Sequence, residues 1–400
     1  MLKYDNCCLM VLADKHMSST NITASIPINK PWIGEEERHE VMHVLEENAL
    51  TSAAKDGGKR VRDFESLLRD HLKVKHVIAV NSGTTSLYAA LLSAGVKQGD
   101  EVLLPSFTFV ATANSIVAAG AKPIFVDINK DDFTIDVSRL KAKITKKSKA
   151  IIPVHLYGHP SDMDEIIELC NTHSLDLIED ACQSLGSVYK KKQTGTMGIM
   201  GCFSLYASKV LTCGEGGAIA TDNDNLADKL KMIRNHGMVE GYDTRVFGLN
   251  FRLPELSAAV AKAQMNKLPK MLDLRRQNAE LLTEMLFPIV DKSKIKVPQE
   301  TQEKKFNWYL YTIAFEENNI RDKIKEKMIN DKIGVAIYYK PPVHKTPYYD
   351  RLVSSDKNNN NLDKTEWASE HVLSLPVHPS LTNQDIERMV ESIKKHNSIS

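Results

Sequence analysis

The chain has 400 residues, which is enough for one large domain and a second, smaller one. Its 52 basic and 51 acidic side chains nearly cancel, so the composition argues against a nucleic acid or a membrane surface as a partner. No apolar run reaches the roughly 20 residues that a membrane-spanning helix needs.

Residues 1–25 are polar and show no periodicity, so we expect them to be disordered. Their one apolar run, Cys7–Ala13, lacks the basic flank and the cleavage site of a signal peptide. The six cysteines show no metal-ligand spacing. We therefore expect free thiols, no bound metal and a cytoplasmic location.

The first predicted elements are two helices. Glu35–Asn48 has acidic residues in its first turn and places Val41, Val44 and Leu45 on one face. Val61–Leu72 shows the same apolar periodicity. Both segments are therefore predicted to pack one face against a core.

From residue 77 the pattern changes to alternating strands and helices. Short apolar runs between turn residues predict strands at Val77–Val80, Glu101–Leu104, Pro123–Asp127, Ala150–His155, Leu175–Ile178, Cys202–Tyr206 and Ala218–Thr221. Helices are predicted at Ser86–Ala94, Val110–Ala119, Asp162–His173 and Leu226–Asn235. Repeated β-α-β units imply an α/β fold with a mainly parallel sheet that helices cover on both faces. Ligands of such sheets bind at the carboxyl ends of the strands.

The C-terminal part is predicted to form a smaller domain. A long helix at Pro254–Leu286, broken only near Pro269, leads into it. Its other expected elements are strands at Trp308–Phe315 and Val335–Tyr338, a loop at Ser354–Asp363 and a closing helix at Asn383–Lys395. The predicted organisation is an N-terminal extension (1–25), a large domain (26–265) and a small domain (266–400).

Lys209 is the residue around which the candidate chemistry is organised. It lies between two predicted strands and is followed by the glycine-rich turn Gly214–Gly217. A lysine amine held in a partly desolvated site suits a Schiff base with a carbonyl compound. The alternative is an ordinary solvated lysine, which is the commoner role of this residue.

Asp180 follows another predicted strand. A partly shielded carboxylate at that position can pair with a protonated ring nitrogen, as pyridoxal phosphate requires. The alternative is a helix N-cap, a common use of aspartate.

Four further positions are candidates, and three of them have a similar double interpretation. Ser82–Thr85 lies where a strand passes into a helix, so its N–H groups and hydroxyls suit a phosphate or form a plain N-cap. Ser204 can add a hydroxyl to the same phosphate. Phe109 can stack on a cofactor ring or belong to the core. Gln183 can face the cofactor or be an ordinary residue of a first helical turn.

In chain order these segments resemble the DegT/DnrJ/StrS-type family of sugar aminotransferases. The matching segments are Asn81–Thr84, Pro105–Phe109, Pro153–Gly158, Glu179–Gln183, Phe203–Lys209, Gly214–Gly217 and Gly248–Arg252. The resemblance runs from about Ile26 to the C-terminal helix. It implies the type I fold of aspartate aminotransferase, with a large domain that binds pyridoxal 5'-phosphate and a smaller α+β domain. The first 25 residues lie outside the family pattern, and Ser208 stands where the family often has threonine.

The resemblance also implies roles for single residues. Lys209 would form the Schiff base with the cofactor and then shuttle the proton, and Asp180 would pair with the pyridine nitrogen. Phe109 would stack on the ring, and Gln183 would lie on the side of its hydroxyl group. The residues implied for phosphate binding are Gly83, Thr84, Ser204 and, from the neighbouring subunit of a homodimer, Asn250.

The function that the resemblance implies is transfer of an amino group, from glutamate, to a keto carbon of a nucleotide-linked sugar. Lys209 favours transamination, because a sister branch that dehydrates sugars has histidine at this position. Similarity of Pro153–Gly158 to perosamine-type members favours a 4-keto-6-deoxy sugar. Two alternatives stay open. One is another pyridoxal phosphate reaction, for which Arg252 would bind a carboxylate; the other is a sugar-sensing regulatory protein.

Overall fold

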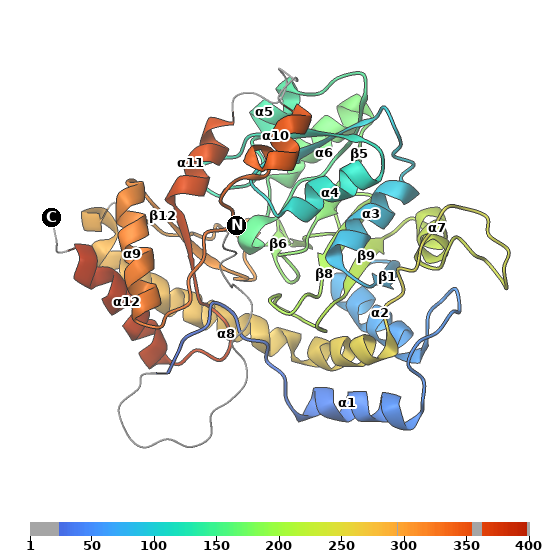
Figure 1. Ribbon diagram of the computed structural model, residues 1–400, viewed down its shortest axis with the longest axis horizontal. Helices are drawn as coiled ribbons and strands as arrows, with labels where there is room; N and C mark the ends of the chain where they lie inside the picture. The colour runs from blue at the N-terminus through green and yellow to red at the C-terminus, as the bar shows by residue number, and fades with distance from the viewer. Residues whose placement is uncertain (1–23, 294, 354–361, 398–400) are drawn as a thin grey trace, which may run out of the picture.

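The fold was established from a computed structural model that describes residues 24–293, 295–353 and 362–397. The expectations for residues 1–23 and for the loop at 354–361 lie outside the described residues. Figure 1 shows a large body around a central sheet and a smaller group of elements beside it, with one long helix, α8 (Glu255–Ser293), running along both. Within the described part of the chain no helix is long and apolar enough to cross a membrane.

The central sheet has seven strands in the order β1-β9-β8-β5-β4-β2-β3. These strands are β1 (His76–Val80), β2 (Glu101–Pro105), β3 (Lys122–Val126), β4 (Ser148–Ile151), β5 (Asp176–Asp180), β8 (Met200–Ser204) and β9 (Gly217–Thr221). β9 runs antiparallel to both of its neighbours, and the other pairings are parallel. The prediction of an α/β fold with a mainly parallel sheet is therefore confirmed.

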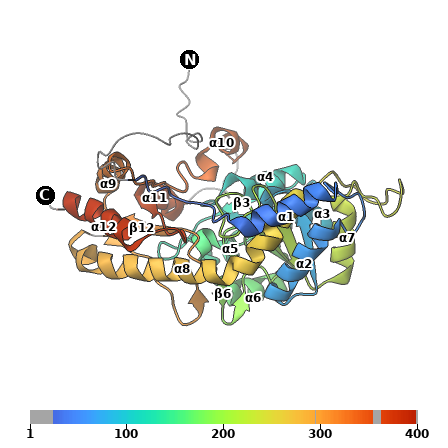
Figure 2. The same cartoon turned by 90° about the horizontal axis from the view of Figure 1, so that it is seen from below.

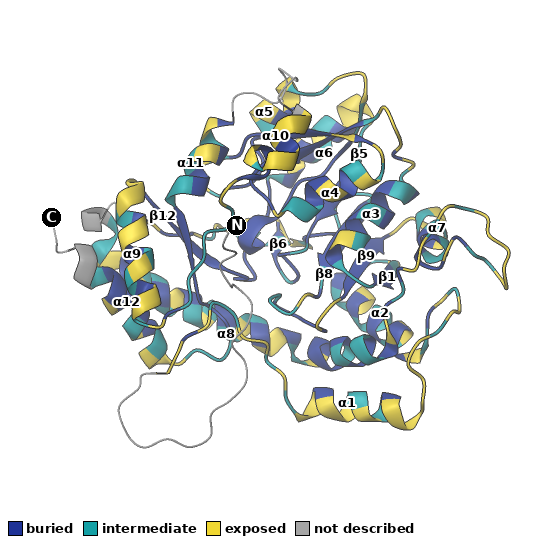
Figure 3. Ribbon diagram, in the orientation of Figure 1, coloured by how far each residue is buried: buried dark blue, intermediate teal, exposed yellow. Residues whose placement is uncertain are grey.

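Helices cover both faces of this sheet, as continuous apolar strands require. The helices of the large body are α1 (Glu35–Glu46), α2 (Lys59–Leu72), α3 (Gly83–Ser93), α4 (Val110–Ala118), α5 (Val137–Ala142), α6 (Met163–His173) and α7 (Asp224–Arg234). Ile78 and Ile219 pack on the face covered by α3, α4 and α7, whereas Ala79 and Ala218 pack on the face covered by α2 and α8. Figure 3 shows the buried strands between these partly exposed helices.

The long helix differs from the prediction at Pro269, where it continues without a break. Proline removes one helical hydrogen bond and costs about 3 kcal/mol in a helix interior. Here Leu268 and Met271, which are 0% and 1% exposed, are buried in the core on either side of the proline. The helix also packs against α1 and α2, as Figure 2 shows. This packing holds the helix together across Pro269.

The smaller group of elements has its own apolar core, which includes Leu282, Ile313 and Met389. Its sheet has the order β10-β12-β13. The elements of this part are β10 (Ile295–Lys296), β12 (Tyr311–Phe315), α9 (Asn318–Asn330), α11 (Asp363–His371), β13 (Val372–Leu375) and α12 (Asn383–Asn397). The helix α10 (Pro347–Val353) packs on the large body instead, where its Tyr349 joins the core beneath α3 and α4. A third small sheet joins β6 (Val188–Tyr189), β7 (Lys192–Gln193) and β11 (Lys304–Lys305).

Two predicted strands were partly wrong. The segment Val335–Tyr338 forms only an isolated bridge, between Ala336 and Ser374. After this bridge the chain turns toward a cavity in the large body, where the Tyr157 hydroxyl donates to the Tyr338 carbonyl in place of a strand neighbour. The strand predicted at Ala150–His155 ends at Ile151, and only Val154 bridges again, to Asp180.

Candidate active site

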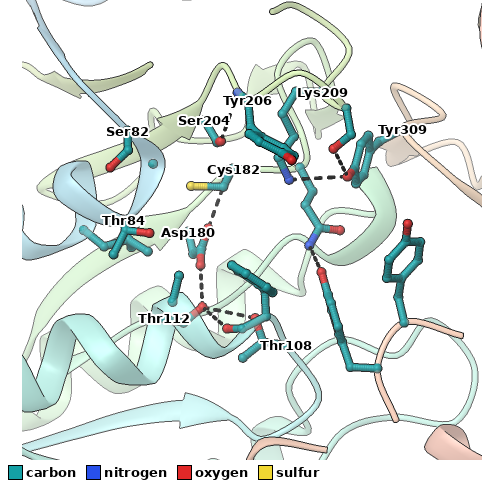
Figure 4. A pocket seen from close by; sticks show the side chains of 18 of the residues that line it. Ser82, Thr84, Thr108, Thr112, Asp180, Cys182, Ser204, Tyr206, Lys209 and Tyr309 are labelled. Atoms are coloured by element: carbon teal, nitrogen blue, oxygen red, sulfur yellow. Dashed lines mark hydrogen bonds between the residues drawn. The ribbon is translucent and has the colours of Figure 1, made fainter. Parts of the chain in front are cut away.

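A cavity of about 470 Å³ lies at the carboxyl ends of the central strands. Segments far apart in the sequence meet in it, as Figure 4 shows. Its lining includes Ser82, Gly83, Thr84, Thr108, Phe109, Thr112, Asp180, Cys182, Gln183, Ser204, Tyr206, Ser208, Lys209, Glu215, Tyr309, Tyr338 and Tyr339. Seven of the eight residues predicted from the sequence as site residues are thus brought together, and Asn250 is the exception.

Lys209 lies in the turn that joins β8 to β9, and its half-buried side chain lines the cavity. Its Nζ atom lies 4.5 Å from the centre of the Tyr309 ring and donates to the Tyr309 hydroxyl at 3.5 Å. The glycines of the turn allow a close backbone approach: a Cβ atom on Gly217 would lie 2.3 Å from the Ser82 carbonyl oxygen. The lysine is therefore held inside a cavity rather than on a solvated surface.

Asp180 is the last residue of β5 and is only 4% exposed. Its Oδ1 atom accepts from the backbone N–H of Cys182 at 3.1 Å, and its Oδ2 atom accepts from the Thr112 hydroxyl at 2.8 Å. Each carboxylate oxygen thus has one fixed donor and keeps acceptor capacity for a group in the cavity.

The start of α3 fits a phosphate group. Ser82 is the N-cap and accepts from the backbone N–H of Thr85 at 3.1 Å, so Gly83 and Thr84 form the first turn, whose N–H groups have no partner within the helix. A Cβ atom on Gly83 would lie 2.7 Å from Cβ and 3.0 Å from Oγ of Ser204. The glycine therefore keeps the Ser204 hydroxyl and this helix start close together, which is the donor set that a phosphate needs.

Phe109 and Gln183 complete the predicted set within the chain. Phe109 is 53% exposed at the cavity, so it is not a core residue. Gln183 is buried, its Oε1 atom accepts from the Tyr157 N–H at 2.8 Å, and its Nε2 atom donates to the Tyr339 hydroxyl at 3.1 Å. Its amide is thus oriented by two contacts.

Asn250 is exposed and lies outside the cavity lining of its own chain. It forms an antiparallel bridge with Asn235, and its carbonyl accepts from the Asn81 side chain at 3.2 Å. This contact ties the backbone of Asn250 to the residue before the N-cap of α3, while the residue itself is exposed.

Several cavity residues were not predicted from the sequence. Tyr309, Tyr338 and Tyr339 come from the C-terminal part, where the segment containing Tyr338 was predicted as a strand, and Thr112 lies inside a helix with no motif of its own. Burial raises the pKa of the Cys182 thiol and of the Tyr339 hydroxyl well above their usual values, so both groups are neutral hydrogen-bonding partners at neutral pH.

The sequence pattern of the DegT/DnrJ/EryC1/StrS aminotransferase family matches residues 31–394. GDP-perosamine synthase from Caulobacter vibrioides is 33% identical over 92% of this chain and 97% of that protein. The spore coat polysaccharide biosynthesis protein SpsC of Bacillus subtilis is 31% identical over 92% and 96%. A pleiotropic regulatory protein of Geobacillus stearothermophilus is 36% identical over 90% and 95%.

Among solved structures, NtdA from Bacillus subtilis with the bound cofactor PMP superposes with a TM-score of 0.82 at 32% identity. The match covers 91% of this chain and 82% of that one. Together with the cavity described above, these matches identify the fold and the cofactor. The chain belongs to the DegT/DnrJ/EryC1/StrS aminotransferase family, and it is a transaminase that uses pyridoxal 5'-phosphate.

Proposed function

We propose that the enzyme transfers an amino group from glutamate to a keto carbon of a nucleotide-linked deoxy sugar, as a step in amino-sugar and polysaccharide biosynthesis. The observation that carries this proposal is the cavity that holds the Lys209 amine and the Asp180 carboxylate beside a helix N-terminus. The similarity to the perosamine synthase and to the polysaccharide biosynthesis protein SpsC supports a sugar substrate. The resemblance to perosamine-type members favours a 4-keto-6-deoxy sugar among these substrates.

The residues that would hold the cofactor lie at the carboxyl ends of the central strands. When bound, pyridoxal 5'-phosphate supplies a protonated ring that draws electrons from the reacting carbon. Asp180 would keep a proton on the ring nitrogen through the acceptor capacity that its two hydrogen bonds leave free. The N–H groups of Gly83 and Thr84 and the hydroxyl of Ser204 would hold the phosphate.

The remaining side chains orient the reaction and move its proton. Phe109 would cover a face of the cofactor ring and exclude water from it, and Gln183 would lie on the side of the ring hydroxyl. The Lys209 amine takes up and returns the proton at its Nζ atom, a task that requires the amine to be held in reach of the reacting carbon. Its contact with Tyr309 supports this assignment, because it keeps the amine inside the cavity.

The substrate assignment predicts turnover with glutamate and at least one member of a panel of UDP-, GDP- and dTDP-linked keto sugars. The measurement is mass spectrometry of the aminated sugar nucleotide, with heat-inactivated enzyme as the control. Glutamate-dependent conversion of the cofactor without amination of any sugar would contradict a sugar acceptor. Release of carbon dioxide or an aldehyde from an amino acid would instead indicate another pyridoxal phosphate reaction.

A regulatory role is the second candidate, because the Geobacillus relative is named as a pleiotropic regulatory protein. A protein that only senses a sugar would bind the panel members without aminating them. If calorimetry detects binding of a sugar nucleotide and no aminated product forms, the regulatory role is favoured. Formation of the aminated product favours the enzyme.

We propose further that the active unit is a cytoplasmic homodimer, and that residues 26–265 and 266–400 form its large and small domains, with α8 crossing between them. The segment around Asn250 supports the dimer, because its apolar residues Phe247 and Leu249 are 62% and 42% exposed. Exposed apolar side chains that lie together favour a protein contact. In the dimer, Asn250 would reach the phosphate in the partner's cavity.

Mixed dimers test this shared site. We expect Lys209→Ala and Asn250→Ala homodimers to be strongly impaired, and a mixed dimer of the two chains to recover about half of the wild-type turnover. The reason is that one of its two sites then has both residues intact, by the two-fold arrangement of a homodimer. The measurement is turnover of co-expressed, doubly tagged dimers. If Asn250 acts within its own chain, each mixed site stays damaged and no activity returns.

A further inference from the structure

Thr112 is a buried residue of α4 whose hydroxyl contacts the Asp180 carboxylate. Its side chain lines the cavity and the residue is 1% exposed. The Oγ1 atom of Thr112 lies 2.8 Å from Oδ2 of Asp180. Figure 4 shows Thr112 beneath Asp180, on the side away from Lys209.

The single hydroxyl proton of Thr112 has three acceptors in reach. These are Asp180 Oδ2 at 2.8 Å, the Thr108 hydroxyl at 3.1 Å and the Phe109 carbonyl at 3.2 Å. A carboxylate is the strongest of the three acceptors, and its distance is the shortest. The proton therefore points to Asp180, and the buried Thr108 hydroxyl donates in turn to Thr112.

The contact also links two parts of the site. Phe109 is the N-cap residue of α4 and Thr112 lies in its first turn. The start of this helix thus sets the position of both the aromatic ring at the cavity and the Asp180 carboxylate. The other carboxylate oxygen, Oδ1, accepts from the N–H of Cys182, just after β5. One donor from α4 and one from the loop after β5 thus fix the orientation of the carboxylate.

We propose that Thr112 is a positioning residue of the transamination: its hydroxyl orients the Asp180 carboxylate toward the cofactor's ring nitrogen. This inference rests on the proposed role of Asp180. The structural alternative is a first-turn threonine that bonds the Phe109 carbonyl three residues earlier, which would contribute to helix stability alone.

The chain offers a matched control for the structural alternative. Thr365 on α11 also donates a hydroxyl hydrogen bond to a buried aspartate, Asp127, at 2.8 Å, and both residues are at most 1% exposed. Neither residue lines the cavity. Replacing threonine by valine removes the same kind of bond at both positions and keeps the side-chain shape.

The experiment compares Thr112→Val, Thr112→Ser and Thr365→Val as holoenzymes reconstituted with 15N-labelled pyridoxal phosphate. We expect kcat of Thr112→Val to fall about tenfold with the KM for glutamate little changed, because hydrogen bonds that orient the ligands of metal sites are worth about 10- to 100-fold and the bond to Asp180 has the same orienting task. We expect the 15N shift of the ring nitrogen to move toward the unprotonated value. Serine should restore both readouts, and Thr365→Val should change neither.

Three results would overturn the inference: wild-type kcat and 15N shift in Thr112→Val, an equal loss of kcat in Thr365→Val, or no rescue by serine. Melting temperatures of the cofactor-free variants separate stability from positioning. If Thr112→Val does not fold, Thr112→Ala removes the same hydroxyl with less crowding and is judged by the same readouts.

The variant Asp180→Asn, measured in parallel, distinguishes the proposed role of Asp180 from that of Thr112. If Asp180→Asn leaves the 15N shift of the ring nitrogen unchanged, the role of Asp180 itself is refuted. If the 15N shift changes in Asp180→Asn but not in Thr112→Val, only the positioning role of Thr112 is refuted.

Discussion

Replacing Lys209 by alanine is expected to abolish turnover, with a loss of at least about 10³-fold, because the side chain supplies both the reacting amine and the group that moves the proton. Borohydride reduction of the wild-type holoenzyme should attach the cofactor permanently to the peptide that contains Lys209. The alanine variant should still bind pyridoxal phosphate without a covalent link, since the helix start at Gly83 and the Ser204 hydroxyl are unchanged. The measurements are steady-state kinetics, peptide mapping and equilibrium dialysis of the cofactor.

Lys262→Ala is a suitable control for this prediction. Lys262 is 27% exposed and pairs with Glu40 at 3.0 Å, outside the cavity. Losing such a surface pair costs little, at most about 1 kcal/mol. The control should keep its turnover and its label on Lys209. A label on a different lysine, or wild-type turnover of Lys209→Ala, would contradict the assignment.

The sheet and the central site were predictable because their signals are local. The strand at Val77–Val80 needed only its apolar run, and the observed β1 differs from it by one residue. Lys209, Asp180 and Gly83 each follow or precede such a strand, and parallel strands place their carboxyl ends at one edge. The positions of these three residues next to predicted strands were therefore enough to predict that they lie close together.

The contacts that complete the site depend on distant parts of the chain. Tyr309 meets Lys209 across 100 positions, and Thr112 meets Asp180 across 68. No periodicity in the sequence encodes such pairs. The first arises from how the small part packs on the large part, and the second from how α4 packs on the central sheet. Pro269 shows the same limit in the fold, because burial of Leu268 and Met271 overrides the local preference of proline to break a helix.

Replacing Asp180 by asparagine is expected to lower turnover by about 10²- to 10³-fold, the usual effect of removing one charged or polar group aimed at a reacting centre. The fold should survive, because the amide can satisfy both neighbours of the carboxylate. Its oxygen can accept from the Cys182 N–H, and its NH₂ group can donate to the Thr112 hydroxyl. Thr112 then redirects its own proton to the Phe109 carbonyl, which already lies 3.2 Å away.

The second N–H of that amide would face the cavity, so a donor would stand where the carboxylate offered an acceptor. A ring nitrogen opposite a donor no longer keeps its proton, and the loss should therefore appear in kcat and in the cofactor's absorption spectrum rather than in the melting temperature. Wild-type turnover in Asp180→Asn would mean that the residue only accepts the Cys182 N–H at the end of β5. A large drop in melting temperature with an unaltered spectrum would likewise assign Asp180 to the fold, because the charge would then have no effect on the ring.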